Sequence, residues 1–464
     1  MGNAATQATL AELQRRFGPD LVADGAASAP RQDWSGIAAV TPVAVLRPRG
    51  SADVAAIVRA CHDLGQPLVV QGGLTGLSGG AVVQPGEAAL SLERMTRIES
   101  IDPVAGTMVV EAGATLQSVQ EAAAAAGFQF ALDLGARGSC TIGGNIATNA
   151  GGIRVIKYGM MRDQLLGVEA VLADGRLLDN MHHMVKNNSG YDLRNLLAGS
   201  EGTLAVITRA VLRLRAVPRS VQTAWCGLPD FESVGRFLVA ARATLGDGLS
   251  AFEVMWASFH DRVIAHVPGL RRPLHDNHLF HVLVESSAMQ TEGHEAAFTA
   301  FLARALEEGL LTDAAIARSG QDARNFWAIR ECPEMGSMIR NPVVFDISAS
   351  ASAVGRMLVD CESEVSANWP GSPFVALGHL GDGNIHIMVG APDADARTHN
   401  AIEDRVCEVV ERHRGSISAE HGIGLKKRRH LGHCRSELDV ALMRNLKAAL
   451  DPANILGRGR IFPA

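Results

Sequence analysis

The chain has 464 residues, of which 47% are hydrophobic, so it is long enough for two or three domains with sizeable apolar cores. Its formal net charge of -6 argues against a nucleic-acid binder, because such proteins carry a basic face. It has no uncharged run of about 18 apolar residues that could span a membrane. The N-terminus also lacks the basic start and apolar core of a secretion signal, so we expect a protein of the cytoplasm or an organelle matrix.

The first half of the chain alternates helical and extended patterns. Apolar side chains recur at helical spacing after Ser51, and short runs rich in Val, Leu and Ile are bounded by glycines. Asp174 and Gly175 indicate the turn of a β-hairpin. Helices are predicted at 51–65 and 115–127, and strands at 67–70, 107–113, 165–179 and 202–217. Residues 1–217 are therefore predicted to form a first domain of mixed helices and strands.

The pattern of the first domain ends at Pro218, and longer helices alternate with strands beyond it. Helices are predicted at 231–245, 294–308 and 396–414, and strands at 278–285, 343–348, 373–378 and 384–389. We expect a second, α+β domain at 218–440 that binds the substrate. A tail at 441–464 is expected to return to the first domain.

Glycine is concentrated in two segments of the first domain. Residues 72–80 read GGLTGLSGG, and residues 135–152 read GARGSCTIGGNIATNAGG. Backbone N–H groups in such segments can turn inward and hold an anion, although each segment could also be a pair of tight turns. A Rossmann loop would open into a helix, whereas Pro85 and Gly86 force a turn here. The sequence therefore predicts that loop amides hold a pyrophosphate without a long helix behind them.

Two histidines flank a tight turn in the second domain. In GHLGDGNIHIMVG, residues 378–390, the glycine turn can fold His379 and His386 toward each other. Glu420, in SAEHGIG, could complete a His₂Glu set, which leaves a coordination position open as catalytic metal sites do. Residue chemistry alone leaves a second interpretation open, in which the histidines merely decorate a hairpin and Glu420 lies in an exposed loop.

Three longer motifs resemble a known family. GGLTGLSGGA, LGARGSCTIGGNIATNAGG and SGYDLRNLLAGSEGTLAVIT resemble the flavin-binding domain of FAD-linked oxidases of the vanillyl-alcohol-oxidase type. The D-lactate and D-2-hydroxyglutarate dehydrogenases are the most similar branch. The resemblance implies an α+β fold, with a two-part FAD-binding domain and an α+β cap domain. It implies FAD contacts at Gly72, Gly73, Leu74, Thr75, Gly76, Leu77, Ser78, Gly135, Ser139, Thr141, Gly144, Asn145, Thr148, Gly202 and Ile207.

The same resemblance implies the chemistry. FAD is expected to be non-covalent, because the first glycine loop lacks the histidine that tethers it in some relatives. A divalent metal, with zinc favoured over Mn²⁺ or Fe²⁺, is expected on His379, His386 and Glu420. His421 would accept the hydroxyl proton of a D-2-hydroxy acid, Arg330 of FWAIRE would clamp its carboxylate, and a hydride would pass to flavin N5.

The electron acceptor implied by the family is not NAD but an electron-transfer flavoprotein, a quinone or a cytochrome. A homodimer is the default assembly. An FAD oxidase that uses O₂, a non-catalytic flavin electron carrier and a metallohydrolase remain alternatives.

Three positions depart from the family pattern. Val344 and Met388 stand where 2-hydroxyglutarate dehydrogenases carry a lysine and an asparagine that hold the far end of the substrate. An apolar pocket disfavours a second carboxylate, so a D-lactate-like monocarboxylate is expected rather than D-2-hydroxyglutarate. The tail reads GRGR at 457–460 in place of the usual N-P-G-K, which puts a cofactor contact there in doubt.

Overall fold

The computed structural model describes residues 2–28, 31–38 and 40–463 and divides into two compact units. The first unit comprises residues 1–152, 158–217 and 420–464, and the second comprises residues 153–157 and 218–419. The chain therefore passes from the second unit back to the first between Ala419 and Glu420. The assignment of 218–440 to a substrate domain stays a prediction.

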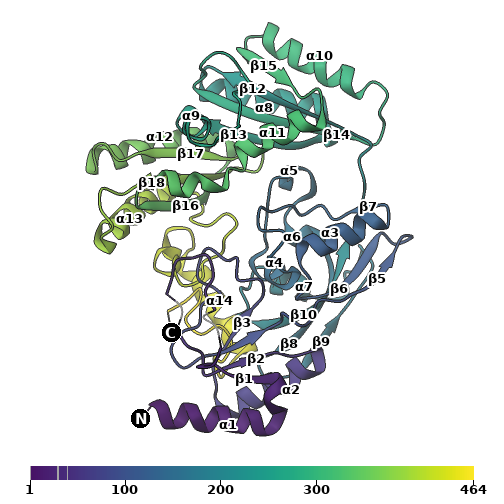
Figure 1. Ribbon diagram of the computed structural model, residues 1–464, viewed down its shortest axis with the longest axis vertical. Coiled ribbons are helices and arrows are strands. Elements are labelled where there is room, and N and C mark those ends of the chain that lie inside the picture. Colours follow the sequence, from purple (N-terminus) through teal and green to yellow (C-terminus); the bar gives the residue numbers. More distant parts are fainter. Residues whose placement is uncertain (1, 29–30, 39, 464) are drawn as a thin grey trace. The chain divides into compact units, whose positions relative to one another are not determined.

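The first unit contains two main sheets (Figure 1). The four-stranded sheet has the order β1-β2-β4-β3, with parallel pairs on both sides of β4. Its strands are β1 (Val22–Asp24), β2 (Ala44–Leu46), β3 (Leu68–Gln71) and β4 (Ala88–Ser91). The five-stranded sheet is antiparallel, in the order β5-β6-β10-β8-β9. Its strands are β5 (Ile98–Asp102), β6 (Thr107–Glu111), β8 (Leu165–Leu172), β9 (Leu177–Asn180) and β10 (Ala205–Arg213).

The helices of the first unit share one apolar core with these sheets. Helix α2 begins after Gly50 and ends at Gly65, whose φ of 62° lets it close the last turn. The helices are α1 (Gly2–Leu21), α2 (Ser51–Leu64), α3 (Leu116–Ala125), α4 (Ile142–Thr148), α6 (Met161–Gln164), α7 (Leu193–Leu197), η3 (Arg428–His433) and α14 (Glu437–Leu450). A small ribbon joins β7 (Phe128–Gln129) to β11 (Arg215–Ala216).

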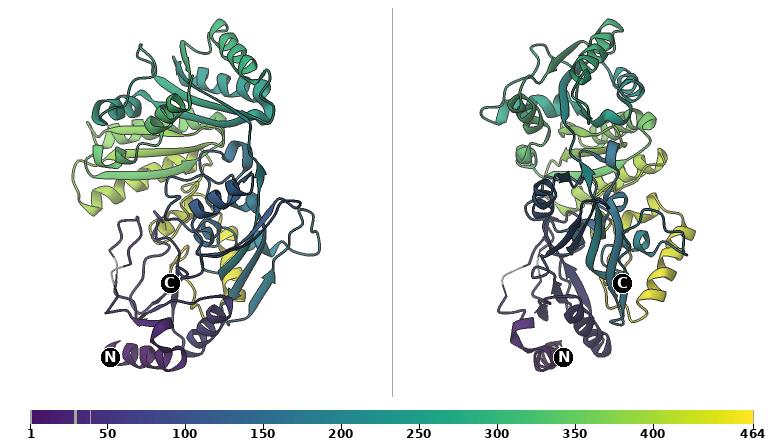
Figure 2. Two further views of the ribbon diagram at one scale, coloured as in Figure 1. Left: turned by 45° about the vertical axis from the view of Figure 1, so that its right-hand side comes forward. Right: turned by 90° about the vertical axis from the view of Figure 1, so that its right-hand side faces the viewer.

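The second unit is built on a seven-stranded antiparallel sheet, in the order β15-β12-β14-β13-β17-β18-β16 (Figures 1 and 2). The strands are β12 (Ser220–Leu228), β13 (Leu249–Trp256), β14 (Phe280–Ala288), β15 (Asp313–Ile316), β16 (Pro342–Ser348), β17 (Phe374–His379) and β18 (Asn384–Gly390). Helices α10, α8, α12 and α13 contact one another in that order and form one layer, while α9 and α11 contact each other as well as the sheet.

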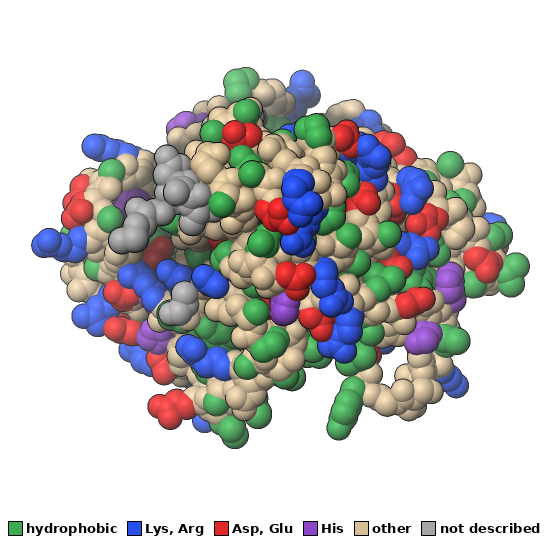
Figure 3. Space-filling model, turned by 90° about the horizontal axis from the view of Figure 1, so that it is seen from below, with side chains coloured by type: hydrophobic (Ala, Val, Ile, Leu, Met, Phe, Trp, Pro, Cys, Tyr) green, Lys and Arg blue, Asp and Glu red, His purple; other side chains and the backbone are tan. Residues whose placement is uncertain are grey.

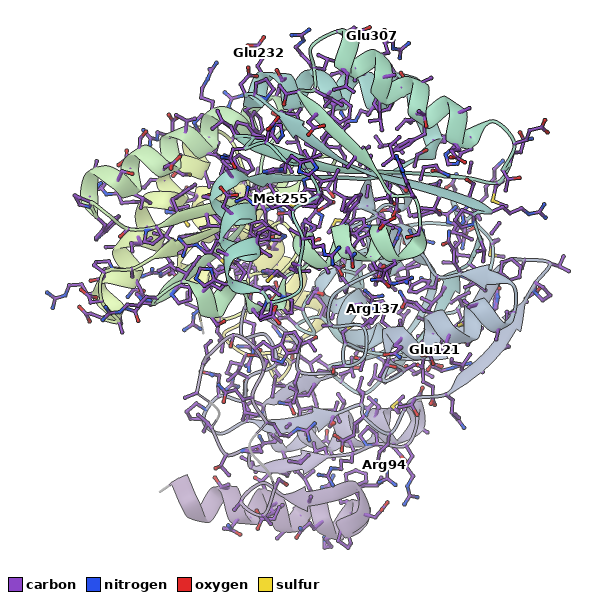
Figure 4. All side chains as sticks on the ribbon, turned by 45° about the horizontal axis from the view of Figure 1, so that its top comes forward. Arg94, Glu121, Arg137, Glu232, Met255 and Glu307 are labelled. Carbon is purple, nitrogen blue, oxygen red and sulfur yellow. The ribbon has the colours of Figure 1, made fainter. Side chains whose placement is uncertain are left out.

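The helices of this unit are α5 (Val155–Tyr158), whose last residue is assigned to the first unit, α8 (Phe231–Leu245), α9 (Ala257–His266), α10 (His294–Glu307), α11 (Gly320–Arg330), α12 (Ala351–Asn368) and α13 (Ala396–Arg412). Two 3₁₀ turns are η1 (Gly246–Gly248) and η2 (Pro333–Met338). A core cluster, which includes Trp225, Phe259 and Phe326, packs α9 and α11 onto the sheet. Met255 of β13 belongs to this cluster and is labelled in Figure 4.

The elements predicted from periodicity are confirmed to within a few residues, including the β8–β9 hairpin around Asp174 and Gly175. The second glycine segment differs from its prediction as loop alone, because it contains the short helix α4, which Thr141 caps by accepting from Gly144 N–H. The predictions also omit α12, although its buried Val354, Leu358 and Val365 follow helical spacing.

The seven cysteines are free thiols, six of them buried. Among the described residues, no helix is long and apolar enough to cross a bilayer. Lysines and arginines are interspersed with acidic side chains on the face drawn in Figure 3, as the small net charge suggests.

Candidate functional site

The two glycine segments lie against each other in the first unit. A Cβ on Gly72 would lie 2.3 Å from Thr141 Oγ1, and a Cβ on Gly73 would lie 1.8 Å from Ser139 O. Glycine is therefore required at both positions by close backbone approach. The sequence predicted a shared ligand for these segments, and the contact between them makes one composite loop surface.

The first segment has the unpaired donors that a phosphate needs. Within the described residues, the N–H groups of residues 73–78 donate no hydrogen bond to the protein. Leu74 adopts a left-handed φ of 55°, as residues in anion-binding turns do. Consecutive unpaired N–H groups on a glycine loop fit the pyrophosphate of FAD.

The remaining residues predicted to contact FAD lie around this surface or just behind it. Asn145 is buried and donates to Cys140 Sγ, and the Thr148 hydroxyl donates to Gly144 O within α4. Ile207 is buried in β10, beside an irregularity in its pairing with β8. Gly202 has a φ of 70°, and a Cβ on Gly135 would meet open space. Their contacts with FAD stay predictions.

The loop that carries Glu420 and His421 is fixed by both glycine segments. Gly152 N–H donates to Glu420 Oε1 at 2.8 Å, and a Cβ on Gly151 would lie 2.3 Å from the same oxygen. At the other end of the loop, Ser78 Oγ donates to Gly422 O at 2.9 Å. The predicted catalytic loop therefore contacts the loops that are predicted to hold FAD.

Glu201 is a second anchor of this loop that the sequence analysis missed. Its carboxylate accepts from Ile423 N–H at 2.8 Å and from Gly424 N–H at 2.7 Å. Burial raises the pKa of this carboxyl, and the two N–H donors and Lys427 oppose the rise. Glu201 has a φ of 52°, which is an uncommon backbone conformation for glutamate. No local pattern in the sequence indicates this conformation or this contact.

In the second unit, the hairpin of β17 and β18 brings the two predicted histidine ligands together. The imidazole rings of His379 and His386 are nearly perpendicular, with centroids 5.4 Å apart. Asp382 makes the turn, because its carboxylate accepts from Asn384 N–H at 3.1 Å. Burial raises the pKa of Asp382 to about 6. The side-chain amide of Asn384 is buried without a hydrogen-bond partner among the described residues, so a polar ligand could lie beside it.

Arg330 is held by a buried carboxylate that the sequence did not indicate. Glu253 Oε2 accepts from Arg330 Nε at 2.7 Å and from Nη2 at 2.6 Å. The other oxygen, Oε1, lies 2.9 Å from His379 Nδ1. Burial alone would raise the pKa of Glu253, but His379 and Arg330 together bring that pKa below its usual value, so Glu253 is an anion. The hydrogen bonds of Arg330 in the described residues use Nε and Nη2 and leave Nη1 for another acceptor.

Glu420 directly follows Ala419, whose N–H donates to Asp346 O of β16 at 3.2 Å. His379 and His386 belong to the second unit and Glu420 to the first, so their joint binding of one cation stays a prediction. Two imidazoles and a carboxylate are the ligand types of catalytic divalent-cation sites.

The two departures from the family pattern lie side by side. Val344 of β16 and Met388 of β18 are register partners, two residues along their strands from Asp346 and His386. Met388 belongs to the apolar cluster beneath α9 and α11, whereas Val344 is largely exposed. The side of His386 toward Met388 is therefore apolar, whereas its register partner Asp346 places a carboxylate 3.8 Å from His386 Nδ1.

Comparison with known proteins gives the family. Residues 217–461 match the family described as FAD linked oxidases, C-terminal domain, and residues 42–180 match the one described as FAD binding domain. The chain belongs to the FAD-linked oxidases. It is an FAD-dependent oxidoreductase, as the three motifs indicated.

This FAD-linked oxidase is similar to curated dehydrogenases over most of its length. It is 39% identical to the D-2-hydroxyglutarate dehydrogenase of Xanthomonas citri pv. viticola, over 93% of this chain and 91% of the relative. It is 38% identical to the mitochondrial D-2-hydroxyglutarate dehydrogenase of Bos taurus, over 94% and 79%. It is 36% identical to the putative mitochondrial D-lactate dehydrogenase C713.03 of Schizosaccharomyces pombe, over 89% and 80%.

Two solved structures show how widely the fold is shared. p-Cresol methylhydroxylase with substrate bound superposes with a TM-score of 0.79 at 13% identity, over 99% of this chain and 98% of that one. An alkyldihydroxyacetonephosphate synthase gives a TM-score of 0.74 at 17% identity, over 97% and 85%. At such low identity these matches establish the fold alone. They confirm the predicted α+β architecture of the vanillyl-alcohol-oxidase type.

Proposed function

We propose that this FAD-linked oxidase is a metal-dependent dehydrogenase that oxidises a D-2-hydroxy acid to the 2-oxo acid. The observation that carries the proposal is the hairpin that brings the imidazole rings of His379 and His386 to a centroid distance of 5.4 Å. Glu420 and His421 support it from the loop that contacts both glycine segments. Relatives named D-2-hydroxyglutarate and D-lactate dehydrogenases support the reaction class.

The glycine segments would hold FAD without a covalent bond, through the N–H groups of residues 73–78 and the loop around Ser139. The bound flavin supplies the acceptor for the hydride that leaves the substrate carbon. Since the Glu420–His421 loop contacts both glycine segments, the residues proposed for proton transfer lie next to those proposed for flavin binding.

His421 accepts the proton of the substrate hydroxyl, which is the usual role of a histidine beside a reacting alcohol. A divalent cation on His379, His386 and Glu420, with Zn²⁺ favoured, would supply a Lewis acid for that hydroxyl. Arg330 binds the substrate carboxylate through Nη1, because Glu253 occupies Nε and Nη2.

The substrate we favour is a monocarboxylate with a small or apolar side chain. Met388 and Val344 provide apolar contacts beside His386 and no partner for a second carboxylate. The relatives do not decide between substrates, since the proteins named for 2-hydroxyglutarate and for lactate have nearly equal identity to this chain. We infer an electron acceptor other than NAD, such as an electron-transfer flavoprotein, a quinone or a cytochrome. We also infer that the protein is a homodimer located in the cytoplasm or an organelle matrix.

Anaerobic mixing of the FAD-loaded protein with D- and L-2-hydroxy acids tests the proposal. We expect D-lactate or a longer D-monocarboxylate to bleach the flavin, with L-isomers inert and D-2-hydroxyglutarate slower. Bleaching by D-2-hydroxyglutarate alone would overturn the substrate assignment. Steady peroxide production in air would instead favour an oxidase, and no bleaching by any 2-hydroxy acid would favour an electron carrier.

A further inference from the structure

One face of the seven-stranded sheet carries a short row of buried polar side chains. Glu253 of β13 and His379 of β17 are direct register partners, so both side chains project from the same face. Arg330 comes from the end of α11, which packs on that face. The exposed fractions are 1% for Glu253, 6% for Arg330 and 7% for His379, so these three polar side chains interact with little water between them.

A single carboxylate joins the other two side chains. One oxygen of Glu253 accepts both the Nε and Nη2 donors of Arg330, and both oxygens lie 2.9 Å from His379 Nδ1. A charged carboxylate is an acceptor only, so Nδ1 must carry the proton in this contact. Nε2 of His379 then keeps its lone pair, which is the form that ligates a metal, and Arg330 Nη2 lies 3.4 Å from it.

We propose that Glu253 is a positioning residue that fixes the tautomer and ring orientation of His379, so that Nε2 is presented to a divalent cation. This inference rests on the proposed function, because it needs His379 to be a metal ligand. Carboxylates that receive the second N–H of a ligating histidine raise its basicity, and their loss typically weakens metal binding 10–100-fold. Arg330 balances the charge that this carboxylate brings into the core.

A purely structural ion pair is the competing explanation, and the same sheet provides a matched control. Glu285 of β14 is also buried, but it accepts from Ser250 Oγ at 2.9 Å and from Trp327 Nε1 at 3.2 Å. It makes no hydrogen bond to His379 among the described residues. If only the loss of a buried carboxylate mattered, Glu285→Gln and Glu253→Gln should weaken Zn²⁺ binding equally. If the positioning of His379 matters, only Glu253→Gln should weaken it.

The test measures Zn²⁺ affinity of the FAD-loaded protein, stripped of metal, by competition with a chromogenic chelator. Glu253→Gln presents an NH₂ group to Nδ1, which favours the Nε2–H tautomer and blocks the lone pair. We expect its Kd for Zn²⁺ to rise 10–100-fold relative to the unsubstituted protein. Glu285→Gln should keep the unsubstituted Kd, and FAD content and Tm are recorded for every variant.

Glu253→Gln leaves the Arg330 guanidinium buried without its partner, which is destabilising. The double variant Glu253→Gln/Arg330→Gln removes both charges, and it should show the same weakened Zn²⁺ binding. Unchanged affinity in either folded variant, or an equal loss in Glu285→Gln, would overturn the role of Glu253. If the unsubstituted protein itself bound no Zn²⁺, the proposed metal-dependent function would fail together with this inference, a result distinguishable from failure of Glu253 alone.

Discussion

The backbone around His421, the proposed general base, is held by residues far away in the chain. Gly152 N–H binds the preceding Glu420, and Glu201 binds the N–H groups of Ile423 and Gly424, so the backbone on both sides of His421 is fixed. A general base works only within hydrogen-bond reach of the proton that it takes, and a fixed loop supplies that reach. Neither Gly152 nor Glu201 was identifiable from the sequence, because both contact the loop from more than 200 residues away.

Replacing His421 by alanine should abolish proton transfer while leaving the FAD-binding loops intact. We expect flavin reduction by the substrate to slow by about 10²–10⁴-fold, measured by anaerobic stopped flow, with unchanged FAD per chain. His182→Ala, in an exposed loop of the same unit, serves as the control, and its flavin should be reduced at the rate of the unsubstituted protein. Normal reduction in His421→Ala would refute the assignment.

At the scale of elements, the glycine segments behave as one structure although 60 or so residues separate them. A Cβ on Gly73 would lie 1.8 Å from Ser139 O, so no side chain fits there. Thr141 Oγ1 lies beside Gly72 of the first loop and also caps the start of α4. The sequence indicated close backbone approach in each segment, and the family resemblance implied that both contact FAD, which stays a prediction. The sequence was insufficient to show that the segments approach each other.

Gly73→Ala places a methyl group 1.8 Å from a backbone oxygen, so the two loops must move apart. We expect the first unit to lose about 1–3 kcal/mol of stability and to retain less FAD after gel filtration. Gly235→Ala, in the interior of α8 with no atom within 4 Å of the new Cβ, should instead stabilise the protein slightly. Equal FAD retention and stability in Gly73→Ala would contradict the packing of the loops.

The packing of α9 onto β14 makes the second unit sensitive to acid. His281 stacks on His260, with centroids 3.9 Å apart, and accepts from Trp225 Nε1 at 3.0 Å. Burial, and then the neighbouring His260 and His278, lowers the pKa of His281 to about 2. The unfolded chain therefore binds a proton below about pH 6.5 that the folded chain does not bind until about pH 2.

The contribution of His281 to the free energy of unfolding is therefore fully present above about pH 6.5. It falls as the pH drops below that value, by at most about 1.4 kcal/mol per pH unit. His281→Gln keeps an acceptor for Trp225 but cannot titrate, so its Tm should decline less between pH 7 and pH 5. His275→Gln, an exposed control, should follow the original protein. Parallel declines in all three proteins would show that His281 is not responsible.

At the scale of the whole molecule, the C-terminal tail completes the first unit. Leu456 bridges to Leu68 of β3, and Arg460, 2% exposed, pairs with Glu87 and donates to the carbonyl oxygens of Gly80 and Val82. The assignment of 441–464 as a tail of an FAD-binding domain stays a prediction. The departure from the family pattern at Arg460 has a structural role, because this residue fixes the segment that follows the first glycine loop.

Arg460→Met should leave the Glu87 carboxylate buried without its counter-charge, with only the Gln84 N–H as a donor. Breaking such a pair typically costs about 3–5 kcal/mol, so we expect a lower Tm and loss of FAD. Arg458→Met removes an exposed arginine from the same tail and should change neither property appreciably. An unchanged Tm in Arg460→Met would show that the tail does not stabilise the loop.

The sequence by itself determined the local structure and the chemistry of the short motifs. Periodicity located the helices and strands that it predicted to within a few residues, and seven residues of spacing across a glycine turn were enough to pair His379 with His386. Such features depend on interactions between residues near one another in the chain, so composition and spacing reveal them. The family motifs added FAD for the same reason, since each is a continuous stretch.

Only the tertiary structure decided which side chains hold these motifs in place. Glu253 meets His379 across 126 residues, Glu201 meets Ile423 across 222, Gly152 meets Glu420 across 268, and Glu87 meets Arg460 across 373. A buried carboxylate has no local pattern, because its partner is chosen by sheet register and loop packing rather than by neighbouring residues. The positioning of the candidate site is therefore a property of the folded chain.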